Sequence, residues 1–233
     1  MKPSPPSILP TLSAGLLLLL ALLLAFGCEQ SKHEDNQPPE QAQTRKYQGT
    51  IVALGDSLTA GKGVSEEEAY PALLQKKLQE NGYNFRVINA GISGETSSGA
   101  LSRINWILTL KPDIVILETG ANDGLRGIPT TVLADNLRQI IQVLQQNKVT
   151  VVLAGMQMVR NLGPDYTSDF AKVYPRVARR EGVNLIPFFL QGVAGDPTLN
   201  QEDTIHPTAK GYRIVVDTVY PYVVLAIRER EGK

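Results

Sequence analysis

Five short apolar runs, rich in valine and isoleucine, recur along the chain after Tyr47. They span residues 51–54, 85–88, 114–117, 149–153 and 184–186. Apart from Arg86, Thr150 and Asn184, the runs are continuous and do not alternate regularly with polar residues, a pattern typical of parallel strands that are covered on both faces. We therefore expect five buried strands.

Apolar residues at helical spacing fill the intervals between these runs. Ser65 and Glu68 form a capping box ahead of the first of them. The expected helical segments are the stripe of Leu73, Leu74 and Leu78 before Gly82, residues 133–144, residues 170–178 before Gly182, and a last segment from Thr208 to about Arg230 with a kink at Pro221. Alternating strands and helices predict a single α/β domain, from residue 47 to 233, with a three-layer, doubly wound, mostly parallel sheet.

Polar residues that could take part in a reaction follow several of the predicted strands. Ser57 follows the first, the segment 91–94 follows the second, and the segment 120–123 follows the third. His206 lies after the last strand and before the last helix. Because the functional crevice of such a sheet lies beyond the carboxyl ends of its strands, we expect these segments to converge at one edge.

The residues at that edge supply the parts of a serine hydrolase. Ser57 is a candidate nucleophile, and His206 is the one histidine of the predicted domain that can act as its base. Asp203 can orient the imidazole and stabilise its cationic form. Candidate donors to an oxyanion are the Ser57 and Gly94 backbone N–H groups and the Asn122 side-chain amide.

Each of these segments also has a structural interpretation. Asp56 and Ser57 could cap a helix, the segment 122–124 is an ordinary turn sequence, and the segment 203–207 could be a loop that leads into a capped helix. Their joint order at strand ends favours a site. A phosphate loop around Gly61 and Lys62 is excluded, because Asp56 and Gly63 stand where that motif needs glycine and Ser or Thr. No His/Cys cluster has metal-ligand spacing, and we expect no cofactor.

Four blocks of the chain resemble the motif blocks of the GDSL/SGNH hydrolases. They are residues 55–58, Gly94, residues 120–123 and residues 203–207, and the resemblance extends from about Tyr47 to Tyr222. The segments 70–74, 122–127 and 186–189 are similar to the bacterial multifunctional thioesterase/lysophospholipase/arylesterase branch.

The resemblance implies a flavodoxin-like fold and a triad of Ser57, Asp203 and His206. It also implies Ser57, Gly94 and Asn122 as oxyanion donors. Two features differ from the family. Thr204 stands where glycine is frequent, and the expected loop from Met156 to Ser168, which helps to shape the acyl site in that branch, has its own composition.

The expected function is hydrolysis of acyl esters or thioesters, including aryl esters and lysophospholipids, through an acyl-Ser57 intermediate. Two alternatives stay open. One is a carbohydrate O-deacetylase of the cell envelope, and the other is a non-catalytic lipoprotein that binds acyl chains or glycans. Lys+Arg and Asp+Glu number 23 each, so no basic field indicates a nucleic-acid partner.

The first 46 residues are expected to lie outside the fold. Residues 1–27 resemble a lipoprotein signal peptide, with an apolar core at 14–26 that is short for a bilayer span. The segment Ala25-Phe26-Gly27-Cys28 resembles a lipobox, although Ala25 replaces the usual leucine. We expect Cys28 to carry lipid, residues 28–46 to form a polar tether, and the protein to reside in a bacterial envelope, facing the periplasm or the exterior. The alternative is ordinary cleavage of the signal peptide, which would give a secreted, soluble protein.

Overall fold

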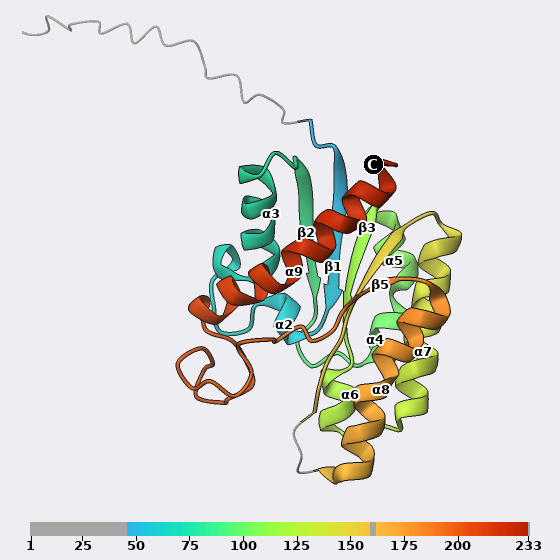
Figure 1. Ribbon diagram of the computed structural model, residues 1–233, viewed down its shortest axis with the longest axis vertical. Helices are drawn as coiled ribbons and strands as arrows, with labels where there is room; N and C mark the ends of the chain where they lie inside the picture. The colour runs from blue at the N-terminus through green and yellow to red at the C-terminus, as the bar shows by residue number, and fades with distance from the viewer. Residues whose placement is uncertain (1–45, 159–161, 233) are drawn as a thin grey trace, which may run out of the picture. The chain divides into compact units, whose positions relative to one another are not determined.

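The computed structural model describes residues 46–158 and 162–232 and contains a parallel five-stranded sheet. The strand order is β2-β1-β3-β4-β5, the order of flavodoxin-like doubly wound folds. The strands are β1 (Gly49–Gly55), β2 (Phe85–Gly91), β3 (Ile114–Glu118), β4 (Thr150–Ala154) and β5 (Asn184–Ile186). All five predicted strands are thus present, and the predicted fold class is confirmed (Figure 1).

The expectation that every strand is covered on both faces is correct for the centre of the sheet and wrong for its edge. All five residues of β3 are buried. In β2, Arg86 is exposed and the next three residues are only half-buried. β2 pairs with β1 alone in the sheet, so it lies at the edge, where coverage by neighbouring elements is incomplete.

Helices cover both faces of the sheet, which completes the three layers (Figure 1). α3 (Tyr70–Glu80) and α9 (Ala209–Arg230) pack together on one face. On the other face α7 (Thr130–Gln146) contacts α8 (Pro164–Glu181), α4 (Ser97–Ser102) and α5 (Ile104–Thr109). Buried aromatic rings join the layers, among them Tyr70 and Phe189 at a centroid distance of 5.2 Å.

Some ends of the long helices follow the local signals of the sequence, and others differ from the prediction. Gly182 ends α8 in the left-handed conformation, and Thr208 caps α9, which continues through Pro221. The predicted capping box at Ser65 is present, but it begins a short 3₁₀ helix, η1 (Glu66–Glu68), instead of α3. The expected loop 156–168 is also shorter, because α8 begins at Pro164; residues 159–161 of that loop lie outside the described residues.

Four short helices were not among the predicted helical segments: α4, α5 and two that lie at the carboxyl edge of the sheet. For the first of these two, a helix capped by Asp56 and Ser57 was only an alternative interpretation. α2 (Ser57–Ala60) follows β1, and α6 (Ala121–Leu125) follows β3, where the sequence favoured an ordinary turn. Each spans about one turn, which is too short for a helical period to show in the sequence. Both carry residues of the predicted site.

Candidate active site

Ser57 is presented by the tight connection between β1 and α2. Asp56 is the N-cap of α2, and its Oδ1 accepts a hydrogen bond of 3.0 Å from the Leu58 backbone N–H. The sequence left open whether this segment caps a helix or forms a site, and the structure shows a helix cap that also places Ser57 in a cavity. Gly91 makes the placement possible, because a Cβ there would lie 2.2 Å from the Ala60 nitrogen of α2.

Three predicted site residues form a continuous hydrogen-bonded chain. Ser57 Oγ lies 2.9 Å from His206 Nε2, although the two residues are 149 positions apart. His206 Nδ1 lies 2.6 Å from Asp203 Oδ2. The other Asp203 oxygen accepts hydrogen bonds of 3.0 Å from the backbone N–H groups of Ile205 and His206. This is the geometry in which an imidazole can remove the serine proton while a carboxylate fixes its tautomer.

The Asp203 carboxylate is stabilised in its ionised form. The backbone N–H of His206 is the main cause that lowers the pKa of Asp203 to about 2, with further contributions from the His206 side chain and the Ile205 N–H. Asp203 is therefore charged at any pH at which a neutral imidazole can act as a base.

The loop around Asp203 explains the departure at Thr204. Thr204 has a φ of 61°, in the left-handed region that a β-branched residue seldom adopts. Glycine enters this region without a steric penalty, which accounts for its frequency at this position in the family that the sequence resembles. The hydrogen bonds that Asp203 accepts hold the loop in this conformation.

Gly94 and Asn122 reach the same cavity, which has a volume of about 260 Å³. Gly94 lies in the exposed loop between β2 and α4, with a φ of 80°. The Asn122 side-chain nitrogen lies 3.1 Å from Asp56 Oδ2 and 3.0 Å from the Glu95 carbonyl oxygen, and it donates to both. The structure thus brings every predicted residue of the folded site together. Cys28 lies outside the described residues.

A buried carboxyl pair directly behind Ser57 was not predicted. Glu118, the last residue of β3, is fully buried; its Oε2 accepts from Thr59 Oγ1 at 2.8 Å and from the Asp56 backbone N–H at 3.4 Å. Burial raises the pKa of Asp56 to about 6. Burial, and then the nearby Asp56 charge, raise the pKa of Glu118 well above its usual range. A glutamate that ends an apolar strand was the sequence signal for this pair.

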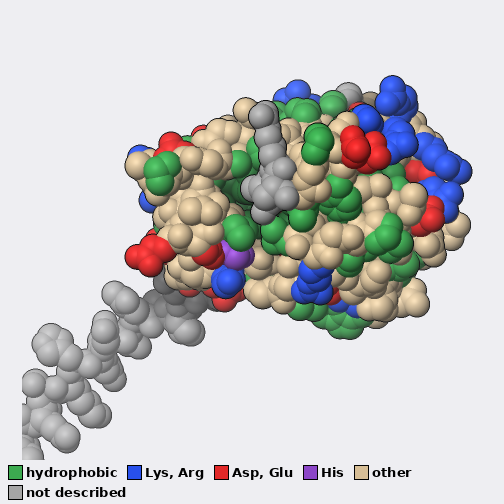
Figure 2. Space-filling model, turned by 90° about the horizontal axis from the view of Figure 1, so that it is seen from below, with side chains coloured by type: hydrophobic (Ala, Val, Ile, Leu, Met, Phe, Trp, Pro, Cys, Tyr) green, Lys and Arg blue, Asp and Glu red, His purple; other side chains and the backbone are tan. Residues whose placement is uncertain are grey.

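The cavity opens to the surface beside apolar side chains. Leu125 and Ile205 line it and are 45% and 42% exposed. Figure 2 shows a histidine side chain, in purple, on the face seen from below, with charged and hydrophobic side chains beside it. Lys62 also lines the cavity. The opening can accommodate an apolar group next to the Ser57 hydroxyl.

Comparisons with known proteins agree with this geometry. The model of the GDSL-like lipase/acylhydrolase family matches residues 53–214. Esterase TesA of Pseudomonas aeruginosa is 41% identical over 173 residues, which cover 74% of this chain and 86% of that protein. Thioesterase 1/protease 1/lysophospholipase L1 of Escherichia coli is 37% identical over 169 residues, which cover 72% and 80%.

A solved structure extends the similarity to the fold. The psychrotrophic esterase EstA from Pseudoalteromonas sp., in a structure inhibited by monoethylphosphonate, is 34% identical with a TM-score of 0.74. The match covers 77% of this chain and 99% of that one. The alternative of a non-catalytic binding protein is therefore set aside. The chain belongs to the GDSL-like lipase/acylhydrolase family and is an ester hydrolase.

Proposed function

We propose that the protein cleaves acyl esters through a covalent acyl-Ser57 intermediate. Ser57 Oγ attacks the carbonyl carbon while His206 Nε2 takes its proton, and Asp203 stabilises the resulting imidazolium. The bond to the leaving group then breaks, and His206 returns the proton to that group. Water repeats the sequence with His206 as base and releases the acid. The observation that carries the proposal is the hydrogen-bonded chain Ser57–His206–Asp203.

The negative charge of the tetrahedral intermediate needs donors that are already in place. The Ser57 N–H is in the first turn of α2 and has no partner within that helix. The Gly94 N–H and the Asn122 amide line the same cavity. Asp56 lines it too, so an incoming oxyanion can replace Asp56 as the acceptor for Asn122.

The proposed substrates are esters or thioesters with an apolar acyl group. The exposed Leu125 and Ile205 at the cavity support this class, as do the esterase and the thioesterase/lysophospholipase among the relatives. A panel of nitrophenyl esters, acyl-CoA, lysophospholipid and acetylated xylan tests it. Turnover of acetylated xylan alone would indicate the carbohydrate O-deacetylase instead.

We further propose that the protein is exported and held on a membrane of the bacterial envelope by lipid on Cys28. The support is the apolar core at 14–26, the lipobox-like segment 25–28 and the polar composition of 28–46. Among the described residues, no helix is long and apolar enough to cross a membrane. Two or three acyl chains would be sufficient for stable attachment.

Replacement of Ser57 by Ala tests the proposed mechanism. We expect turnover to fall by more than about 10⁴-fold, because the covalent route is lost, with little change in the thermal midpoint. Labelling by a fluorophosphonate should disappear in the same variant. Ser93→Ala is the matched control, since Ser93 lines the same cavity and lies outside the triad. A Ser57→Ala variant that keeps more than about a hundredth of the wild-type rate would exclude Ser57 as the nucleophile.

A further inference from the structure

The exposed loop that carries Gly94 is held by two backbone hydrogen bonds: the Ile92 N–H donates to the Gly55 carbonyl oxygen at 2.9 Å, and the Glu95 N–H donates to the Ile92 carbonyl oxygen at 3.1 Å. Ile92, Ser93 and Gly94 are all exposed, and the loop joins β2 to α4. A backbone N–H in such a loop can stabilise an oxyanion only if its direction is fixed before the reaction, because preorganisation is the source of the effect. Side-chain contacts of the neighbouring residue Glu95 fix it further.

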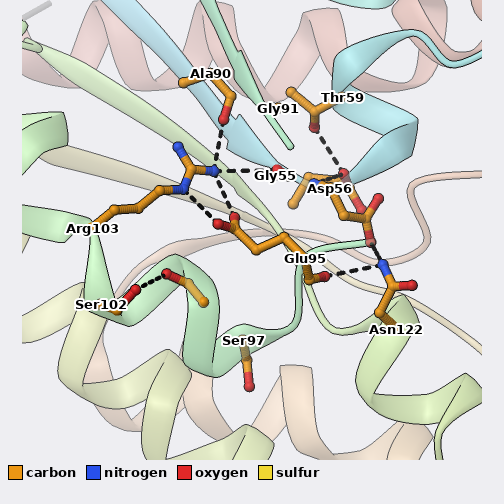
Figure 3. Close-up of polar contacts among 12 residues, drawn as sticks. Gly55, Asp56, Thr59, Ala90, Gly91, Glu95, Ser97, Ser102, Arg103 and Asn122 are labelled. Atoms are coloured by element: carbon orange, nitrogen blue, oxygen red, sulfur yellow. Dashed lines mark hydrogen bonds and ion pairs between the residues drawn. The ribbon is translucent and has the colours of Figure 1, made fainter. Parts of the chain in front are cut away.

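Glu95, the residue after Gly94, forms a two-pronged ion pair with Arg103 (Figure 3). Arg103 Nε lies 2.7 Å from Glu95 Oε1, and Arg103 Nη2 lies 2.6 Å from Glu95 Oε2. Both side chains are largely buried, at 13% exposed for Arg103 and 7% for Glu95. A bidentate, largely desolvated pair of this kind fixes orientation as well as distance.

The same guanidinium also contacts the ends of two strands. Arg103 Nη2 donates to the carbonyl oxygen of Ala90 in β2 at 2.7 Å and, at a longer 3.3 Å, to that of Gly55 in β1. Gly55 is two residues before Ser57. Figure 3 shows Arg103 directed at these two carbonyl groups and at the Glu95 carboxylate. The Arg103 side chain therefore links the loop to β1, the strand that leads to Ser57.

The loop in turn holds the other side-chain donor. The Glu95 carbonyl oxygen accepts from the Asn122 amide at 3.0 Å, and Arg126 Nη2 donates to the Gly94 carbonyl oxygen at 2.7 Å. Gly94 and Asn122 are thus both linked to Glu95. A shift of Glu95 would move both proposed oxyanion donors at once.

We infer that Arg103 and Glu95 are positioning residues for the oxyanion site. Their ion pair aligns the Gly94 N–H and the Asn122 amide with Ser57, and neither side chain touches the substrate. The inference rests on the proposed function, which places Ser57, Gly94 and Asn122 in the reaction. It extends that function by naming the contacts that keep the donors in place in an exposed loop.

The test is steady-state kinetics of Arg103→Lys and Glu95→Gln on a soluble nitrophenyl ester. Lysine keeps the charge but not the fork, and glutamine keeps the shape but loses the charge. We expect kcat to fall about 10–100-fold in each, with KM within about twofold of wild type, because misplaced donors act on the transition state. The acid limb of the pH profile should not move, since Asp203 and His206 are untouched.

Arg138→Lys is the matched control. Arg138 forms an ion pair of 3.0 Å with Asp135 within α7, and neither residue lines the cavity with Ser57. This variant should keep the wild-type kcat. Unchanged kcat in Arg103→Lys and Glu95→Gln, or a change confined to KM, would overturn the inference.

The double variant Glu95→Leu/Arg103→Met separates positioning from stability. It removes both buried charges together, so its thermal midpoint should exceed that of Glu95→Gln, which leaves the Arg103 charge buried without its partner. We expect kcat to stay low in spite of this recovery, and a recovery of kcat along with the thermal midpoint would show that the pair is merely structural. Ser57→Ala, measured in parallel, reports on the proposed function separately, because full activity in that variant would refute the nucleophile and not the ion pair.

Discussion

At the scale of single residues, Asp56 combines two roles that draw on the same carboxylate. One oxygen caps α2 through Leu58, and the other accepts from Asn122. The group is buried beside Glu118, and its pKa is raised to about 6 mainly because burial disfavours the charged form. Burial of the Asp56 carboxylate thus has an energetic cost. Such costs are common at functional sites.

Asp56→Asn should alter the pH dependence of stability. A carboxyl whose pKa is higher in the folded than in the unfolded chain stabilises the fold at low pH, and this contribution is lost as the pH rises from about 4 through about 6. In the variant, the free energy of unfolding should therefore change less with pH over this window, by on the order of 1–3 kcal/mol. Chemical denaturation at a series of pH values measures it.

The exposed Asp165→Asn is the control for the loss of one carboxylate and should keep the wild-type slope. The Asp56→Asn amide cannot accept from both Leu58 and Asn122, so kcat should fall at the same time. An unchanged slope would mean that Asp56 is not the group that titrates in this window.

At the scale of elements, the active geometry depends on how closely α2 approaches β2. The helix that begins with Ser57 packs its backbone directly on the end of the strand at Gly91. The side chain of a larger residue would therefore separate the nucleophile from the histidine, which is positioned independently by the segment before α9.

Gly91→Ala should lower both stability and turnover. Its Cβ would meet backbone atoms of Thr59 and Ala60 within 2.7 Å, so α2 must shift. We expect a loss of about 1–3 kcal/mol in the free energy of unfolding and about a 100-fold loss in kcat. Gly82→Ala is the control, because a Cβ there has open space and the only cost is that of alanine at a φ of 85°. Wild-type kcat in Gly91→Ala would show that α2 accommodates the methyl group without moving Ser57.

At the scale of the whole molecule, we propose that the described fold carries the chemistry and that the first 45 residues determine the location of the protein. The hydrophobic core comprises residues between Ile51 and Ile227. The site lies in the same domain, at the carboxyl edge of the sheet. The proposed anchor at Cys28 would set where the enzyme works without changing its chemistry.

Cys28→Ser should therefore release the protein from membranes and leave its kcat on a soluble ester unchanged. Serine cannot form the thioether to diacylglycerol on which lipoprotein attachment depends. Fractionation of cells and mass spectrometry of the mature N-terminus check the outcome. An unmodified Cys28, or a soluble wild-type protein that begins elsewhere, would contradict the anchor.

Local patterns in the sequence were sufficient for the fold class and for the members of the candidate site. Continuous apolar runs and helical stripes indicate which side of a segment will be buried, and such a pattern is a local property of each segment. Because parallel strands all end at one edge, Ser57, Gly94, Asn122 and His206 could be placed together from their order alone. The short helices and the exposed face of β2 escaped this reasoning, since a single turn has no period and an edge strand resembles a central one.

Only the tertiary structure decided what supports that site. Three features depend on how distant segments pack together. They are the ion pair of Arg103 with Glu95, the hydrogen bond from Asn122 to Asp56 and the burial of Glu118. A charged residue that is read along the chain has the same appearance whether it lies in solvent or in a largely buried pair. Its role depends on the distance and direction of partners far away in the sequence, and these are fixed only when the layers of the fold close on one another.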